Sequence, residues 1–356
     1  MLQNESQSVG KRRPLRLLLA GLLGVGVFAC LASAIAWYLA EQAAAKALDA
    51  FIVSEGARGG VWSCPERRIS GFPLALELSC LEPSFSGLIS GKPMVARMQS
   101  LHARVNLLRP HEVTAQIEAP FALRSEDGRT DLSFTWSSMQ FVVGGVPEEI
   151  AQVSFRGEGL ATQGLAEGIG ALVVQAGRFN GVIGKSAGGQ NRSYDFRFAA
   201  QDVASPWLVM VLGLRQPAEI KTDGTVTEVS FDPSERPAES LEHWRVKGGR
   251  IDFSNLAVSQ GETQVSARGT LKLDATHCLQ GRLDTESLGI EPVLRRHGIN
   301  PSLATAGLLL NSLFGGKKQG AAPPSAPAVL HLPLRLEGGA VIVGPVQTSI
   351  RLPALY

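Results

Sequence analysis

The sequence predicts a mainly β protein of the α+β class. One N-terminal transmembrane helix should precede an elongated, curved and mostly antiparallel β-sheet with a few short helices. After Trp62, most segments alternate apolar and polar residues, as a sheet with one buried face requires. The 39 glycines among 356 residues favour many strands and turns over long helices.

Composition excludes some classes of protein. Hydrophobic residues make up 44% and charged residues 19% of the chain, so a substantial core is possible and general disorder is not expected. The formal net charge is only +2, and the arginines are spread along the chain. Nucleic-acid binding driven by counterion release is therefore not expected.

The N-terminal segment predicts a membrane anchor. Residues 17–40 form an uncharged run of 24 residues, long enough to cross a hydrocarbon core of about 30 Å. Trp37 and Tyr38, at its far end, are typical of the membrane interface. Basic residues precede the run and place the N-terminus in the cytoplasm: Lys11, Arg12, Arg13 and Arg16.

These features predict the domain organisation. Residues 1–16 form a cytoplasmic basic tail, 17–40 the anchor and 41–60 a juxtamembrane helix with Ala and Leu at helical spacing. Residues 61–356 form an exported β-rich domain, with a flexible Gly-, Pro- and Ala-rich insertion at 315–328.

Two other interpretations of the N-terminus remain open. Ala32-Ser33-Ala34 fits a signal-peptide cleavage site, although the apolar run continues beyond it. Cys30 suggests a lipoprotein acceptor, but Phe28 and Ala29 before it match that pattern poorly. All three interpretations export the rest of the chain.

Period-two alternation and Gly, Asp, Asn or Pro at the connections predict the strands. The predicted strands are 101–108, 112–123, 131–143, 151–160, 171–183, 193–203, 225–232, 243–259, 263–274, 329–339 and 340–352.

Helices are predicted at 160–175, 291–297 and 301–314. The last contains a dense apolar patch that fits core packing, a lid over an apolar groove, or a surface for a membrane or partner. The candidate lid consists of Leu308, Leu309, Leu310, Leu313 and Phe314.

No motif predicts catalysis, a cofactor or a metal. Residues 184–188, Gly-Lys-Ser-Ala-Gly, match a hydrolase nucleophile motif, but a strand rather than a helix is expected to follow Ser186. The histidines lack metal-ligand spacing: His102, His111, His243, His277, His297 and His331. We therefore expect a protein that is not an enzyme, and a Ser186 hydrolase is the weakest hypothesis.

Two cysteines flank the turn Gly71-Phe72-Pro73. In an antiparallel hairpin centred on Phe72, Cys64 lies opposite Cys80, and export permits a disulfide between them. A loop of this size predicts about 3 kcal/mol of stabilisation. Two reduced, buried thiols are the alternative. Cys278 is expected to be unpaired or to link two chains.

Nearly the whole chain resembles a known family in order and spacing. The features that carry the resemblance are the basic N-terminus, the anchor, an Ala-rich helix, Trp62, the two cysteines around "ISGFP" and the closing "LPLRLEGGAVIVGPVQTSIRLPAL". It is similar to the uncharacterised bacterial envelope proteins of domain-of-unknown-function family 2125. More distantly, the layout resembles AsmA-like envelope proteins, which implies a link to lipid traffic. The resemblance also implies a single-pass bacterial inner-membrane protein with most of its chain in the periplasm.

The leading functional hypothesis is a non-catalytic, membrane-anchored β-groove protein that binds or transfers lipid in envelope maintenance. The expected partners are a lipid or lipid-like ligand and the inner membrane, and no nucleic acid or cofactor is expected. The alternative is a closed β scaffold that docks another envelope protein. The sequence leaves open which lipid or partner is bound and whether the sheet is open.

Overall fold

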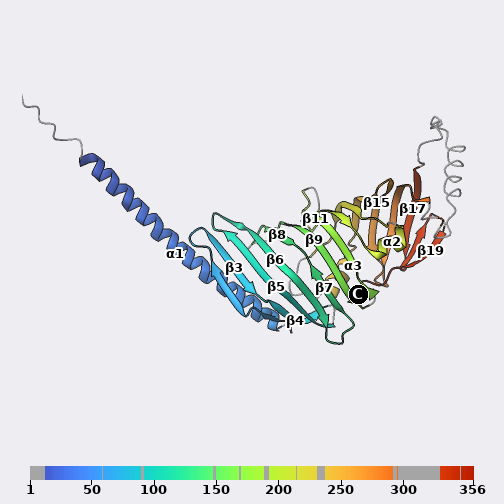
Figure 1. Cartoon of the computed structure of the whole chain (residues 1–356), viewed down its shortest axis with the longest axis horizontal. Coiled ribbons are helices and arrows are strands. Elements are labelled where there is room, and N and C mark those ends of the chain that lie inside the picture. Colours follow the sequence, from blue (N-terminus) through green and yellow to red (C-terminus); the bar gives the residue numbers. More distant parts are fainter. Residues whose placement is uncertain are drawn as a thin grey trace, which may run out of the picture.

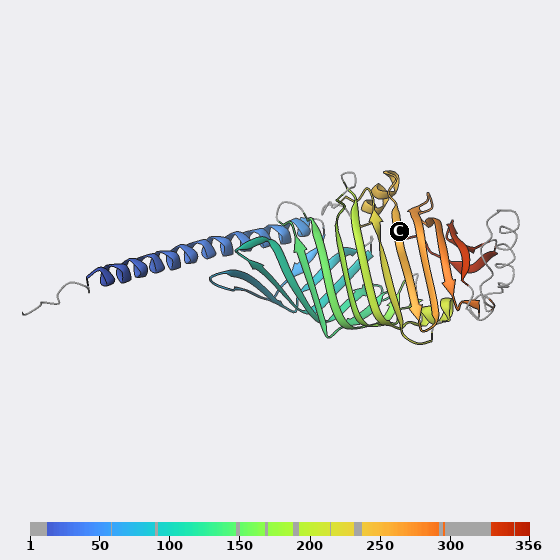
Figure 2. The ribbon, with the colours of Figure 1, turned by 90° about the horizontal axis from the view of Figure 1, so that it is seen from above.

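A single antiparallel sheet of 19 strands dominates the computed structural model (Figure 1). Viewed from above, its strands follow one another along the long axis of the molecule (Figure 2). The predicted mainly β fold, with a large antiparallel sheet and few short helices, is therefore confirmed. The structure describes residues 13–57, 59–89, 92–146, 150–167, 170–187, 192–213, 215–230, 237–291, 295, 329–344 and 346–356.

One continuous helix, α1 (Arg13–Ala57), precedes the sheet and covers the predicted anchor and residues 41–57 of the predicted juxtamembrane segment. Its N-terminal half projects away from the sheet, whereas its C-terminal half lies against the first strands (Figures 1 and 2). The half-buried positions recur every three or four residues, which is the spacing of one helix face. They include Ala34, Trp37, Glu41, Ala44, Leu48 and Ile52.

The strands vary from two to 17 residues in length. The first ten are β1 (Val61–Ser63), β2 (Glu66–Ser70), β3 (Ala75–Leu81), β4 (Ser84–Ile89), β5 (Lys92–Asn106), β6 (Arg109–Ser125), β7 (Asp131–Thr135), β8 (Ser138–Gly144), β9 (Gln152–Ala166) and β10 (Gly170–Ala171). The others are β11 (Val174–Lys185), β12 (Tyr194–Val203), β13 (Ala218–Val226), β14 (Ile251–Gln260), β15 (Thr263–Leu273), β16 (Leu279–Leu288), β17 (Leu330–Glu337), β18 (Ala340–Val343) and β19 (Val346–Arg351).

The topology is a meander with two places where a long strand is paired by two short ones. β3 and β4 share one edge of β5. β7 and β8 both lie between β6 and β9. From β9 the order is β11 to β19 in sequence, with β10 as a short addition on β9. Among the described strands, β1, β2 and β19 each pair with one neighbour, so the sheet is open at both ends.

Two short helices lie in connections between strands. α2 (Pro206–Leu212) is capped by the Ser205 side chain and ends at Gly213, which is in the left-handed conformation. α3 (Pro237–Val246) is fixed to β13 by the Trp244 indole N–H, which donates to the Thr227 carbonyl at 2.7 Å. Neither helix is predicted from the sequence.

Several predicted elements are wrong. The predicted helix at 160–175 is the end of β9, then β10 and the start of β11, because cross-strand pairing outweighs the local apolar spacing. Residues 243–246 of a predicted strand belong to α3, which has Glu239 in its first turn and Arg245 in its last, as the helix dipole favours. β13 lies earlier than predicted, and β4 and β16 were missed.

Within 291–328, only Glu291 and Arg295 are described, and both are helical. The predicted helix at 301–314, with its candidate lid Leu308, Leu309, Leu310, Leu313 and Phe314, lies outside the described residues. So does the predicted insertion at 315–328.

Candidate functional site

One face of the sheet carries an unbroken row of apolar residues and glycines. Residues paired directly across neighbouring strands point to the same face, so a chain of such pairs defines a row. This row crosses the sheet from β3 to β18, and we call it the apolar ladder. Its members are Leu76, Val105, Val113, Val143, Val153, Ile183, Phe196, Gly224, Phe253, Gly269, Leu283, Leu334 and Val343.

The neighbouring row on the same face is also mainly apolar. Phe155 lies at its centre, with ring centroids 6.1 Å from Phe141 and 6.2 Å from Phe198. Gly181 lies beneath the Phe155 ring, and a Cβ there would come within 2.4 Å of it. This row runs through Leu78, Ala103, Ala115, Phe141, Phe155, Gly181, Phe198, Thr222, Leu256, Ala267, Thr285 and Leu332.

The opposite face is polar at the corresponding positions. The row offset by one residue on each strand contains charged and amide side chains, hydroxyls, two imidazoles and two alanines. We call it the polar ladder. Its members are Ser79, His102, Gln116, Gln140, Arg156, Asn180, Ala199, Lys221, Ala257, Ser266, Glu286 and His331.

The apolar ladder is only partly covered. Apart from Gly224 and Leu283, all of its members are half-buried. The buried clusters around Phe179 and around Leu271 join strands that are neighbours in the sheet. Leu208 of α2 packs into the first of these clusters and covers part of it. The described clusters therefore pack side by side along the sheet, and much of the ladder stays accessible.

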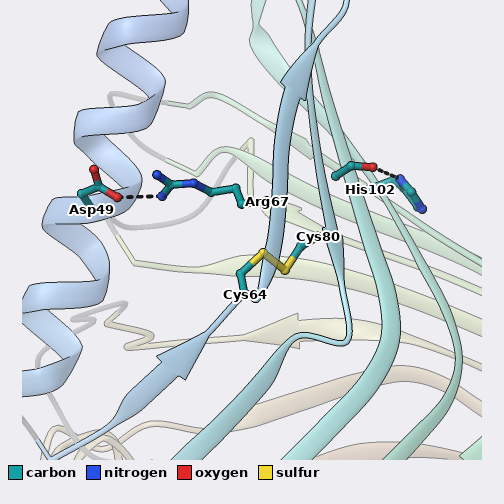
Figure 3. Close-up of a disulfide and its surroundings, with 6 residues drawn as sticks. Asp49, Cys64, Arg67, Cys80 and His102 are labelled. Carbon is teal, nitrogen blue, oxygen red and sulfur yellow. Dashed lines mark hydrogen bonds and ion pairs between the residues drawn. A yellow bond between two sulfur atoms is a disulfide. The ribbon is translucent and has the colours of Figure 1, made fainter.

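A disulfide joins Cys64 and Cys80, as predicted, with Cα atoms 5.7 Å apart (Figure 3). The predicted hairpin register is wrong, however, because Arg67 rather than Cys64 pairs with Cys80. Cys64 lies between β1 and β2, so the bond ties this connection to β3. Cys80 is buried and pairs with Leu101, on the face of the apolar ladder. Cys30 and Cys278 are free thiols.

Helix α1 is fixed to the first hairpin by polar and aromatic contacts. Arg67 donates to Asp49 at 2.6 Å (Figure 3). The Trp37 indole N–H donates to the Ala75 carbonyl at 2.8 Å, and its ring meets Phe72 edge-on at 5.7 Å. Gly71 has φ +101°, and a Cβ there would lie 2.7 Å from the Ala75 carbonyl oxygen, so this turn favours glycine. The Gly71-Phe72-Pro73 turn thus holds α1.

The projecting half of α1 exposes large apolar side chains. Six of these residues are each more than half exposed: Leu23, Phe28, Leu31, Ile35, Tyr38 and Leu39. Trp37, in contrast, is half-buried against the sheet. In the part of the chain that the structure describes, no helix is both long and apolar enough to cross a membrane.

A serine–histidine network lies on the polar face, and it is not predicted from the sequence. The Ser79 hydroxyl is 2.7 Å from His102 Nδ1 (Figure 3), and Ser100 Oγ lies 3.2 Å from His102 Nε2. Ser100 donates in turn to Glu118 at 2.6 Å. Because β3 is paired on both edges around Ser79, its backbone amides serve the sheet and leave no oxyanion-binding pair there. These contacts link β3, β5 and β6 on the polar face.

Three shallow hollows lie over the polar face, with volumes of about 430, 410 and 490 Å³. The first contains Glu286, which lies 4.0 Å from Arg268 and 3.8 Å from His331. All three side chains are about half exposed or more, so such pairs add at most about 1 kcal/mol. The charges in this hollow are balanced in pairs.

A polar cluster joins α3 to residues near 356. Arg245 donates to Glu242 at 2.6 Å, and the Tyr356 hydroxyl donates to the same carboxylate at 2.6 Å. The Tyr356 ring stacks on His277 at 4.3 Å. The hydrogen bond from Arg245, followed by that from Tyr356, lowers the pKa of Glu242 to about 2. The cluster holds the end of the sheet to α3.

The remaining sequence candidates do not converge on a site. Ser186 lies in the turn after β11, where its backbone N–H donates to the Ser193 carbonyl, and β12 follows without an intervening helix in the described residues. Within the described ranges, no group of three or more His, Cys, Asp or Glu side chains is arranged to hold a metal.

The fold and the ladder define a class: a protein with a long N-terminal helix and an open antiparallel sheet that is apolar on one face and polar on the other. A family model described as an uncharacterised protein conserved in bacteria, domain of unknown function 2125, matches residues 37–350. The chain belongs to this family. No curated protein and no solved structure matches it.

Proposed function

We propose that this is a membrane-anchored, non-catalytic protein whose apolar ladder binds or transfers lipid acyl chains in the bacterial envelope. The observation that carries the proposal is the continuous apolar ladder from β3 to β18, of which every member except Gly224 and Leu283 is half-buried. Monomeric soluble proteins rarely expose large contiguous apolar patches, and those that occur mark binding surfaces for a membrane, a ligand or a partner.

The dimensions of the ladder suit acyl chains. Neighbouring strands lie about 4.8 Å apart, so the twelve steps from Leu76 to Val343 extend about 58 Å. One leaflet of a bilayer has an acyl layer of about 15 Å, half of the hydrocarbon core. The ladder is therefore several acyl lengths long. Its side chains offer dispersion contacts and no charge, which is what an acyl chain requires.

Helix α1 supports the membrane part of the proposal. The uncharged run at 17–40 follows basic residues, and several of its large apolar side chains, from Leu23 to Leu39, are exposed. Burying one such leucine or phenylalanine in hydrocarbon is worth about 2 kcal/mol. The proposed topology is a single inner-membrane span with the N-terminus in the cytoplasm and Tyr38 at the outer interface.

The disulfide supports an exported domain. Structural disulfides persist in oxidising compartments such as the bacterial periplasm and are rare in the cytosol. The Cys64–Cys80 bond lies in the domain that follows α1. The proposed location of the sheet is therefore the periplasm.

Two adjacent valines on β8 provide the test. Val143 belongs to the apolar ladder, whereas Val142 points to the opposite face, and both are half-buried. The full chain is extracted in detergent, and its bound lipid is quantified by mass spectrometry. Val143→Asp should reduce bound lipid about tenfold, while Val142→Asp leaves it within about twofold of the unaltered chain, because burying a charge beside an acyl chain is costly. Equal lipid in both variants, or none in the unaltered chain, would contradict the proposal.

A second candidate is the docking of another envelope protein. Among the described strands, β19 pairs only with β18, and a free strand edge can accept an added strand from a partner. Crosslinking in cells distinguishes this function, since it should return one stoichiometric protein bound at β19 and no lipid at the ladder.

A further inference from the structure

The β2–β3 and β5–β6 turns form an exposed apolar tip beside α1. Phe72 and Leu74 lie in the β2–β3 turn, and Leu108 lies in the β5–β6 turn. Their side chains are 58%, 53% and 73% exposed, respectively. The Leu107 backbone N–H donates to the Leu74 carbonyl at 2.9 Å, so the two turns are joined. We call Phe72, Leu74 and Leu108 the tip surface.

The tip surface lies at the level where the apolar run of α1 ends. Phe72 contacts the Trp37 ring, three residues before Ala40. From Leu17 to Trp37 the helix rises about 30 Å, which is the thickness of a hydrocarbon core. If α1 enters the bilayer at Leu17, Trp37 and the tip surface reach its far boundary. In Figure 1 the hairpin of β3 lies beside the middle of α1, next to the projecting half.

The chemistry of the tip suits a membrane interface. Arg109 follows Leu108 directly and is exposed, and Tyr38 and Leu39 are exposed on the adjoining part of α1. Aromatic and aliphatic side chains with a neighbouring basic residue are typical of segments that lie in the headgroup region of an anionic bilayer.

The tip is also continuous with the apolar ladder. Leu76, the first member of the ladder, follows Leu74 by two residues on the same chain, and its ladder partner Val105 precedes Leu107 by two. An apolar path therefore leads from the tip to β3 and β5, where the ladder begins.

We infer that Phe72, Leu74 and Leu108 dock in the outer interface of the bilayer that α1 spans, and that lipid moves there between the bilayer and the ladder. This inference rests on the proposed membrane anchoring. It assigns a location to the exchange, and it orients the sheet with its first turns at the membrane and its later strands away from it.

Site-specific photocrosslinking tests the docking. The full chain, with Leu108→p-benzoylphenylalanine, is reconstituted in vesicles of phosphatidylethanolamine and phosphatidylglycerol and irradiated. The matched control is Leu81→p-benzoylphenylalanine, because Leu81 is 44% exposed at the other end of β3. We expect at least ten times more lipid adduct at position 108 than at position 81. Equal adduct at both positions in a chain that resists carbonate extraction overturns the docking and leaves the anchoring intact. A chain that carbonate extracts overturns both.

A pair of variants tests the lipid transfer. Phe72→Asp together with Leu108→Asp should reduce lipid bound by the vesicle-reconstituted chain about tenfold, without changing carbonate resistance. Leu81→Asp should leave bound lipid unchanged. An intact Cys64–Cys80 peptide in non-reducing digests establishes that the first hairpin has folded in the double variant. Unchanged lipid binding in the folded double variant overturns the transfer at the tip.

Discussion

The two faces of the sheet differ although they come from the same strands. Along β8 and β9 the apolar ladder carries Val143 and Val153, while the polar ladder carries Gln140 and Arg156. Both faces are accessible at many positions. In most domains, a second layer of helices or strands covers the apolar face of a sheet. The difference between the faces therefore supports the proposal that the apolar face binds a ligand or a surface.

Two glycines of the apolar face lie beneath aromatic rings. Gly157 lies beneath Phe179, and Gly181 lies beneath Phe155, both on the apolar side. Cβ atoms at these glycines would come within 2.3 Å and 2.4 Å of the rings. The rings thus occupy the space over the neighbouring strand that a side chain at either glycine would need.

Removing the disulfide should have the largest effect on stability. The double variant Cys64→Ala, Cys80→Ala removes a bond between residues that are 16 apart in the sequence. It should lower the free energy of unfolding by about 3 kcal/mol. The neighbouring Ser79→Ala variant removes the His102 hydrogen bond on the opposite face and should cost about 1 kcal/mol. Urea unfolding of the full chain in detergent measures both. Similar losses of unfolding free energy in the two variants would contradict this, because they would show that both faces stabilise this region equally.

Filling a ladder-side glycine should have the next largest effect. Gly181→Val places a side chain where the Phe155 ring lies, so it should lower the free energy of unfolding by about 2 kcal/mol. Its neighbour Asn180 is exposed on the polar ladder, so Asn180→Val should change stability by less than about 0.5 kcal/mol. Thermal unfolding of the two variants compares them. A larger loss in Asn180→Val would contradict the assignment of faces.

The smallest effect is the pH dependence of the cluster at α3. Because the folded pKa of Glu242 is about 2, below its ordinary value of 4.5, its stabilising contribution is complete above about pH 4.5 and is lost as pH falls toward 2. The attachment of residues 352–356 to α3 should therefore loosen over this range. The Leu355 backbone N–H donates to the His277 carbonyl, so hydrogen exchange at this amide measures the loosening. The Tyr356→Phe variant should weaken this dependence, and an unchanged profile would assign the titration to another group.

Alternation predicted most of the sheet because each strand has one apolar and one polar face. It failed where local signals competed. The segment 160–175 has helical apolar spacing, but Gly164 pairs with Leu132 of β7, and its φ of +142° and close approach to the Asp131 carbonyl favour glycine there. In α3, a proline at the start and a basic residue in the last turn were the available helix signals.

The candidate site was predictable only in part. An apolar face follows from the alternation, and the disulfide follows from export and spacing. The ladder itself depends on the register between strands, which bulges shift at positions such as Met98/Ser100 and Phe253/Leu256. The hairpin register shows the same limit, since Cys80 faces Arg67 and the disulfide reaches it from outside the strand pair. Contacts between α1 and the first turn left no periodic signal in the sequence.

Photocrosslinking within β11 tests the central claim most directly. Val182 and Ile183 are adjacent and half-buried, but only Ile183 belongs to the apolar ladder. Each is replaced in turn by p-benzoylphenylalanine in the full chain in bacterial cells, which are irradiated before lipid adducts are measured by mass spectrometry. The account predicts a lipid adduct at position 183 and at most a tenth as much at position 182. Equal adducts at both positions, or a protein adduct alone at position 183, would contradict it.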